Sequence, residues 1–259
     1  MMDVASLFSV KGRIALVTGG SSGIGRMIAT GFAAAGAKVY ICARSVDKIA
    51  AAAREIAAET GGEVIGLPAD LSAMPGIEAL AASIGDRETA LHILVNNAGT
   101  LVDAPIDDYP ESGWDDVLDL NLKAPFFLMQ KLLPRLRAEA THERPATVIN
   151  IGSVGALKVG PREVYAYAAA KAAIHYSVKS IAKRLGPEHI TVNVIAPGFF
   201  PSEMTKITSD EMERMVIGMV PRRRVGQPED MAGAAIYLAS RAGAYVTGSV
   251  IPVEGGLAI

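Results

Sequence analysis

The chain has 259 residues, of which 50% are hydrophobic and 20% charged, and its formal net charge at pH 7 is −2. Charged residues interrupt each apolar run before the roughly 18 to 20 residues of a membrane span, and the near-neutral charge argues against a nucleic-acid surface. The chain start lacks the features of a secretory signal, and the single cysteine, Cys42, cannot form an internal disulfide. We therefore expect a soluble, cytoplasmic protein that binds neither nucleic acid nor membrane.

Seven short apolar runs alternate with alanine-rich segments along the chain. The runs lie at 13–19, 38–43, 63–69, 91–97, 146–153, 190–198 and 248–256. Such runs are typical of strands covered on both faces, and segments such as 26–36 and 47–62 have the terminal glycine of capped helices. The pattern predicts one α/β domain over 1–259, a doubly wound Rossmann fold with a seven-stranded parallel sheet and helices on both faces. In this fold ligands bind at the carboxyl ends of the strands.

A glycine-rich stretch, TGGSSGIG at 18–25, follows the first predicted strand and opens the next helix. Small residues allow a tight turn there, and the amides of a helix N-terminus attract a pyrophosphate. The alternative is a glycine-rich turn that binds nothing. The residues expected to bind the nucleotide are Gly19, Ser21, Ser22, Gly23, Ile24 and Gly25.

The end of the second predicted strand bears on the choice of nucleotide. Enzymes that prefer NAD usually place a carboxylate there to hold the ribose 2′-hydroxyl, whereas this chain has Ala43 and Arg44. An arginine can pair with a 2′-phosphate, so NADP(H) is favoured and NAD(H) stays possible. The alternative is that Arg44 is a solvated loop charge.

The stretch YAYAAAKAAIHY, 165–176, reads as a helix with Tyr167 four residues before Lys171. On a helix the two side chains share a face, one turn apart. A lysine ammonium beside a phenol favours the phenolate, so we expect Lys171 to lower the pKa of Tyr167 towards the range of a working acid or base. The alternative is an ordinary pair of neighbours. Tyr165 has Ala169 at the same spacing, so packing or a substrate wall is expected of Tyr165 and Tyr176.

Together with Ser153 in INIGS, NNAG at 96–99, and the PG at 197–198, these stretches resemble the short-chain dehydrogenase/reductase family over nearly the whole chain. The resemblance implies that Tyr167 is the catalytic acid/base and Lys171 its partner. It also implies that Ser153 orients a carbonyl and that Asn121 supports a proton relay. The further cofactor-binding residues that it implies are Asp70, Leu71, Asn97, Ala98, Gly99, Pro197 and Gly198, and Tyr167 and Lys171 also face the cofactor.

Within the family, the chain resembles 3-oxoacyl-thioester reductases, which implies NADPH-dependent reduction of a ketone, with an acyl carrier protein as a possible partner. The alternatives are an oxidoreductase of a sugar, polyol, steroid or other small ketone, and a nucleotide-sensing binding protein without turnover. Family resemblance also implies a homotetramer or homodimer. A basic position that carrier-protein reductases use is met by Arg144, but another is occupied by Glu188.

The segment 199–220 is predicted to form a substrate lid, with Phe199, Phe200 and spaced methionines offering an apolar face to an acyl chain. The alternative is a helix that packs these side chains onto the core. The methionines are Met204, Met212, Met215 and Met219. Arg222 and Arg223 follow and could meet an acidic carrier, or could be a solvated charge run.

The histidines lie on separate segments, so no metal site is expected. His175, one turn beyond Lys171, is expected on a helix surface. Arg162, in the loop before Tyr167, either meets an anionic substrate or is a solvated charge.

Overall fold

The computed structural model describes residues 3–202 and 210–259. Its seven strands form one parallel sheet in the order β3-β2-β1-β4-β5-β6-β7. The strands are β1 (Ile14–Thr18), β2 (Lys38–Ala43), β3 (Val64–Pro68), β4 (Ile93–Asn96), β5 (Ala146–Ile151), β6 (Ile190–Pro197) and β7 (Val250–Val253). The predicted doubly wound α/β fold is confirmed, and each strand lies within its predicted run.

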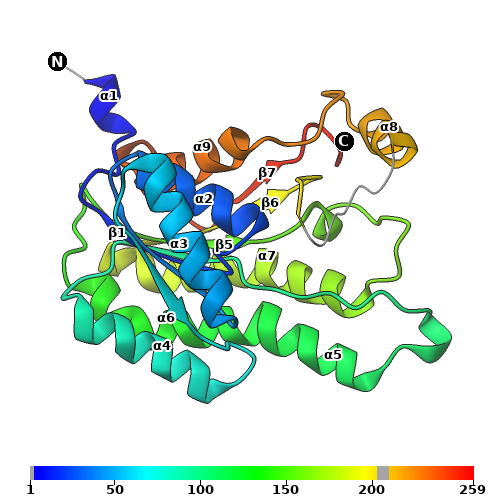
Figure 1. The fold of residues 1–259 in the computed structure, drawn as a ribbon, viewed down its shortest axis with the longest axis horizontal. Coiled ribbons are helices and arrows are strands. Elements are labelled where there is room, and N and C mark those ends of the chain that lie inside the picture. The colour runs from blue at the N-terminus through cyan, green and yellow to red at the C-terminus, as the bar shows by residue number, and fades with distance from the viewer. Residues whose placement is uncertain (1–2, 203–209) are drawn as a thin grey trace.

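Helices cover both faces of the sheet (Figure 1). One face carries α2 (Gly23–Ala34), α3 (Val46–Thr60) and α9 (Pro228–Ala239). The other carries α4 (Met74–Arg87), α6 (Ala124–Arg137) and α7 (Tyr165–Leu185), and α5 (Glu111–Leu118) packs against α7. The short α1 (Val4–Leu7) precedes the sheet, and α8 (Asp210–Met219) lies beyond the carboxyl ends of β6 and β7 (Figure 1). Among the helices in the described ranges, none combines the length and apolar character needed to cross a membrane.

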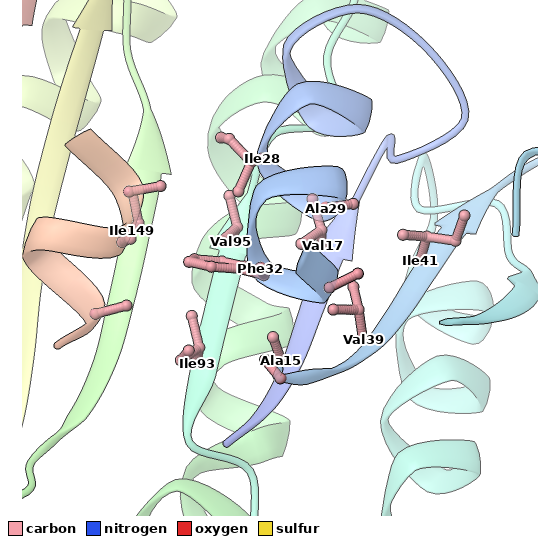
Figure 2. Packing of buried hydrophobic residues seen from close by; sticks show 14 of the residues in the cluster. Ala15, Val17, Ile28, Ala29, Phe32, Val39, Ile41, Ile93, Val95 and Ile149 are labelled. Carbon is pink, nitrogen blue, oxygen red and sulfur yellow. The ribbon is translucent and has the colours of Figure 1, made fainter. Parts of the chain in front are cut away.

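Side chains that alternate along each strand feed two separate cores. In β1, Ala15 and Val17 face α2, where they meet Phe32 (Figure 2), whereas Leu16 between them belongs to the core on the opposite face. This alternation follows from the two-residue period of a strand, and it explains why strands buried on both faces read as continuous apolar runs. Cys42 is buried in β2.

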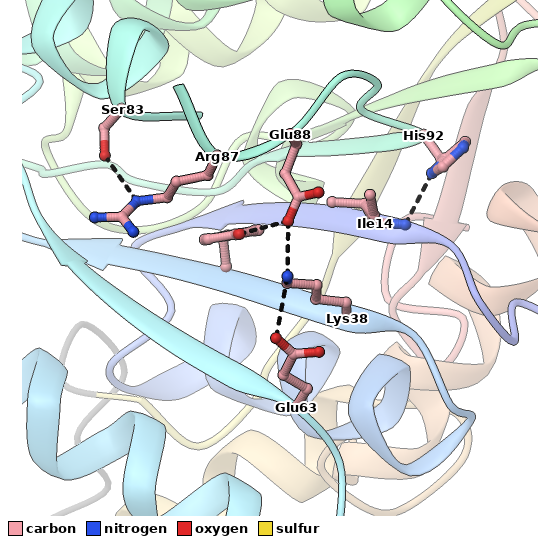
Figure 3. Close-up of polar contacts among 8 residues, drawn as sticks. Ile14, Lys38, Glu63, Ser83, Arg87, Glu88 and His92 are labelled. Atoms are coloured by element: carbon pink, nitrogen blue, oxygen red, sulfur yellow. Dashed lines mark hydrogen bonds and ion pairs between the residues drawn. The ribbon is translucent and has the colours of Figure 1, made fainter. Parts of the chain in front are cut away.

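Charged residues form ion pairs and hydrogen bonds at the amino ends of the strands. Lys38 contacts Glu88 at 2.9 Å and Glu63 at 3.1 Å, and both hydrogen bonds raise the pKa of its ammonium (Figure 3). Buried Arg13 donates to the carbonyl oxygens of Ala239 and Pro145, and burial lowers the pKa of this guanidinium to about 10. These contacts join strands and helices at the amino ends of the strands. The loops of the site lie at the opposite, carboxyl ends.

Candidate active site

The glycine loop after β1 takes a conformation that only small residues permit. Gly19 has φ +66° and Gly23 φ +53°, in the left-handed region that favours glycine. A Cβ on Gly25 would lie 2.4 Å from the carbonyl oxygen of Gly19. In the described part of the chain, the Ser22 side chain makes no capping bond to the first turn of α2. The loop therefore offers a close backbone approach at a helix N-terminus, which fits a pyrophosphate.

Thr18 and Asn97 join this loop to the loop after β4. The Thr18 hydroxyl accepts hydrogen bonds from the backbone amides of Asn97 and Ala98, each at 2.9 Å, and donates to the carbonyl of Val95 at 3.3 Å. The Asn97 side-chain amide donates to the carbonyl oxygens of Thr18 and Gly19 at 2.9 and 3.2 Å. Asn97 thus braces the glycine loop through its side chain. Sequence reasoning missed Thr18, although it ends an apolar strand with a polar residue at the sheet's carboxyl edge.

Arg44 and Asp70 lie near each other at the ends of β2 and β3. Both are exposed, Leu71 beside them is buried, and the Arg44 charge contributes to lowering the pKa of Asp70. The larger cause of that lower pKa is the hydrogen bond from Ser72, whose backbone amide donates to the carboxylate at 3.0 Å. An exposed cation at the tip of β2 matches the place where a nucleotide 2′-phosphate would sit.

Three residues form the centre of the site: Ser153, two residues after the end of β5, and Tyr167 and Lys171 on α7. Tyr167 and Lys171 share one face of α7, with the lysine Nζ 5.5 Å from the tyrosine ring centroid. The Ser153 side chain lies beside the Tyr167 hydroxyl, close enough to act on the pKa of the phenol. Lys171 is buried and its Nζ donates to the carbonyl oxygen of Ile151 at 2.6 Å. The structure thus brings together the hydroxyl, phenol and amine that the sequence singled out.

The pKa of Tyr167 shifts in the opposite direction from the one predicted. Burial raises it, and the smaller opposing contributions come from the neighbouring Ser153 side chain and the Arg162 charge. Burial also lowers the pKa of Lys171 to about 8. The prediction considered the charge of the lysine and left out desolvation, which disfavours the charged form of both groups.

Asn121 lies in a π-helical turn, Asp119–Lys123, between α5 and α6. It is fully buried, and its side-chain amide forms two hydrogen bonds of 2.8 Å with the backbone of Thr100: Oδ1 accepts from the amide, and Nδ2 donates to the carbonyl. A Cβ on Gly99 would lie 3.1 Å from its Oδ1. Such turns are frequent at functional sites. Asn121 therefore fixes the loop after Gly99.

The structure overturns the prediction for His175. The residue is 8% exposed, and its Nε2 accepts a hydrogen bond from the Ser153 backbone amide at 3.3 Å. Its position four residues after Lys171 was the available signal, because positions i, i+4 and i+8 share one helix face. Tyr176, expected to pack or to line the site, is 75% exposed, and Tyr165 packs edge-on against Tyr109 at 5.7 Å.

Arg162 and Asp103 join the two loops above this centre. The Arg162 Nε lies 2.8 Å from the Asp103 carboxylate, which also accepts from the Glu163 amide at 3.1 Å. Both side chains are partly exposed, so Arg162 is ion-paired rather than merely solvated.

The segment after β6 differs in part from the predicted lid. Phe200 is 3% exposed and belongs to the core, against Gly226, because a Cβ on that glycine would lie 2.3 Å from its ring. Met215 and Met219 on α8 are exposed, while Met204 and the Met212 side chain lie outside the described part of the structure. At the start of the segment, Pro197 ends β6 and Gly198 packs closely against Glu254; further on, Ser202 lies 3.1 Å from the Cβ position of Gly23.

The basic residues after α8 do not form one open cluster. Arg224 pairs with Asp230 at 2.8 Å, and the Arg223 guanidinium donates to the Gly218 carbonyl at 2.6 Å. Arg144 and Glu188 lie at the opposite end of α7 from Tyr167, where Glu188 pairs with Arg137 and Arg184. Within one chain, this second group is remote from the site.

A glycine-rich nucleotide cradle beside a hydroxyl, phenol and amine defines a nicotinamide-dependent oxidoreductase of the Rossmann type. The chain belongs to the short-chain dehydrogenase/reductase family: the family profile described as enoyl-(acyl carrier protein) reductase matches residues 19–258. It is 49% identical over 251 residues to the rhamnolipids biosynthesis 3-oxoacyl-[acyl-carrier-protein] reductase of Pseudomonas aeruginosa, covering 96% of this chain and 97% of that protein.

Two solved structures show the same fold. The RhlG/NADP active-site complex of Pseudomonas aeruginosa matches with a TM-score of 0.94 and 48% identity, covering 98% of this chain and 99% of that one. A putative NAD(P)-dependent gluconate 5-dehydrogenase of Beutenbergia cavernae with bound NADP matches with a TM-score of 0.87 and 35% identity, covering 97% and 98%.

Proposed function

We propose that this enzyme uses NADPH to reduce a 3-oxoacyl thioester to the 3-hydroxyacyl thioester. The observation that carries the proposal is the placement of Tyr167 beside the Ser153 side chain, with the Lys171 ammonium 5.5 Å from the Tyr167 ring centroid and Arg44 at the tip of β2. The 49% identity to a 3-oxoacyl-[acyl-carrier-protein] reductase supports the substrate class.

The groups that would hold the nucleotide come from four loops. The backbone of Gly19, Ser21, Ser22, Gly23, Ile24 and Gly25 would take the pyrophosphate. Arg44 would pair with the 2′-phosphate, and Asp70 with Leu71 would border the adenine. Asn97, Ala98 and Gly99 would border the ribose, while Pro197, Gly198 and Lys171 would lie at the nicotinamide end. When bound, NADPH supplies a hydride to the substrate carbonyl carbon.

Ser153 orients the ketone. Its Oγ accepts a hydrogen bond from the Gly155 amide at 3.0 Å. A hydroxyl has one donor and two acceptor sites, so this contact occupies an acceptor site and the O–H can donate to the substrate oxygen. Negative charge develops on that oxygen during reduction, and a donor aimed at it stabilises the transition state.

Tyr167 gives the proton. Burial raises its pKa, so the phenol holds its proton at neutral pH until the substrate oxygen becomes basic. Lys171, fixed on the Ile151 carbonyl, stands behind the phenol and stabilises the phenolate left after transfer. Asn121 holds the Thr100 loop and, in this proposal, supports the route by which solvent returns a proton.

The side chains of α8 favour a substrate with an acyl chain. Val216 and the following Val220 are buried, while Met215 and Met219 are exposed, so the helix is anchored on one side and presents flexible apolar side chains on another. Arg222 and Arg223 follow and could meet the phosphate of a pantetheine-bearing carrier or coenzyme. An acyl carrier protein as partner, a homotetramer or homodimer, and a cytoplasmic location are parts of the same proposal.

A second candidate is reduction of a sugar or polyol ketone, favoured by the 35% identity to the putative gluconate 5-dehydrogenase. NADPH consumption with a 3-oxoacyl thioester and with keto-gluconates at equal concentrations separates the two. We expect the higher kcat/KM with the thioester, and a higher value with the keto-gluconate would favour the second candidate. Turnover of neither, with NADPH still bound, would favour a nucleotide sensor.

A further inference from the structure

Three side chains on one face of α7, each one turn after the last, contact the last residue of β5 or Ser153 just after it. Tyr167 lies beside the Ser153 side chain, Lys171 donates to the Ile151 carbonyl, and His175 accepts from the Ser153 amide. Positions i, i+4 and i+8 of a helix lie above one another, so a single straight helix delivers all three. The proposed mechanism uses the first two and leaves His175 without a role.

The Ser153 amide lies where the sheet ladder stops. The last β5–β6 bond in this region runs from the Gly152 amide to the Ile195 carbonyl at 2.7 Å, and Ser153 is the next residue. Its backbone is still extended, with φ −164° and ψ 148°, and a 3-10 turn, Val154–Ala156, follows. The imidazole Nε2 of His175 accepts this amide at 3.3 Å and so takes the place of a strand partner.

Gly152 makes room for the imidazole. A Cβ at this position would lie 2.2 Å from the His175 Nε2 and 2.6 Å from the Val194 side chain. The ring therefore rests directly on the backbone of residue 152, and any larger residue there would displace it. The small residue at position 152 and the imidazole at position 175 therefore fit each other, although they lie on separate segments of the chain.

Burying the imidazole at position 175 costs stability that burying an aliphatic side chain would not. Its Nδ1 is buried and, within the described residues, has no hydrogen-bond partner. With Nε2 as acceptor, Nδ1 carries the proton and stays unsatisfied, whereas an aliphatic side chain would leave no orphan there. Burial and the Lys171 charge lower the pKa of His175, which keeps the ring neutral and able to accept.

We propose that His175 is a positioning residue for ketone reduction. Its Nε2 holds the Ser153 amide and thereby fixes the path of the chain just after β5, which directs the Ser153 hydroxyl towards Tyr167. The proposal rests on the proposed role of Ser153. It assigns His175 no contact with substrate or nucleotide.

Two variants of similar size test it. His175→Gln retains an acceptor near Nε2, and His175→Met fills the space without a strong one. We expect His175→Gln to keep kcat within about threefold of wild type and His175→Met to lose at least about tenfold, since a displaced catalytic group is costly. NADPH dissociation constants, from fluorescence titration, should match wild type in both. His142→Gln, on an exposed turn, is the histidine control and should change none of these values.

Hydrogen exchange at the Ser153 amide gives a readout independent of turnover. We expect exchange at least about tenfold faster in His175→Met and near wild type in His175→Gln. Equal kcat values in the two variants, or wild-type exchange in His175→Met, would overturn the proposal. Ser153→Ala is measured in parallel. If this variant kept wild-type kcat, the proposed function would fail, and so would the catalytic part of this proposal. The exchange rates alone would then show whether His175 holds the Ser153 amide.

Discussion

Lys171 donates from Nζ to the backbone carbonyl oxygen of Ile151 at 2.6 Å while only 5% of the residue is exposed. The described contacts of this ammonium include a carbonyl and an aromatic ring, and burial lowers its pKa to about 8 from an ordinary 10.5. A buried ammonium whose described contacts are neutral groups destabilises the folded state. The lysine is therefore retained for function at the expense of folding.

This relationship predicts a stability effect with a defined sign. Between pH 8 and 10.5 the unfolded chain binds more protons at Lys171 than the folded one, so stability rises with pH in this window. Below pH 8 the full penalty, of the order of 3 kcal/mol, is present. Lys171→Met should lack ketone reduction and yet unfold at a Tm equal to or above that of wild type at pH 7. Thermal unfolding at several pH values should show the difference shrink as pH rises, and a less stable variant at pH 7 would contradict this account.

Two tyrosines on α7 separate proton transfer from packing. Tyr167→Phe removes the proposed proton donor, and we expect kcat to fall by about 10² to 10⁴ while NADPH still binds. Tyr165→Phe is the matched control, because its ring packs on Tyr109 and lies on another face. Steady-state kinetics with any accepted ketone suffices. Similar losses in both variants would remove Tyr167 from its proposed role.

Arg44 should determine the choice of nucleotide. A charge-assisted contact contributes about 1.5 to 3 kcal/mol, so Arg44→Ala should raise the KM for NADPH by roughly 10- to 150-fold and leave that for NADH nearly unchanged. Arg54→Ala, at an exposed position on α3, is the control for a general loss of positive charge. If wild type used NADH as efficiently as NADPH, the assignment of Arg44 would be wrong.

Thr18 should matter for both stability and nucleotide binding. Thr18→Val keeps the shape but leaves the amides of Asn97 and Ala98 without their acceptor, at about 1 to 3 kcal/mol for each unsatisfied group. We expect a Tm lower by several degrees and weaker NADPH binding, because the two loops lose their link. Thr18→Ser restores the hydroxyl and should recover most of both losses. A Thr18→Val protein with wild-type nucleotide affinity would show that the loops hold their position without this link.

The sequence predicted best where local patterns decide the outcome. Apolar runs located every strand, and the pairing of Tyr167 with Lys171 followed from helical spacing alone. Errors arose where tertiary burial decides: His175 was placed on a surface because its contact, Ser153, lies on another element, and Phe200 was assigned to a lid although it packs on Gly226. The predicted direction of the Tyr167 pKa shift was wrong for the same reason, since desolvation depends on neighbours that are distant in sequence.

The most direct test of the proposed activity is kcat/KM across 3-oxoacyl thioesters of increasing chain length, read from NADPH consumption. If exposed Met215 and Met219 on α8 help to cover the chain, each buried methylene should contribute about 0.8 kcal/mol, a rise of roughly fourfold per carbon. We predict that kcat/KM climbs with chain length and then levels off when the groove is full. A flat profile, together with faster turnover of keto-gluconates, would contradict the account.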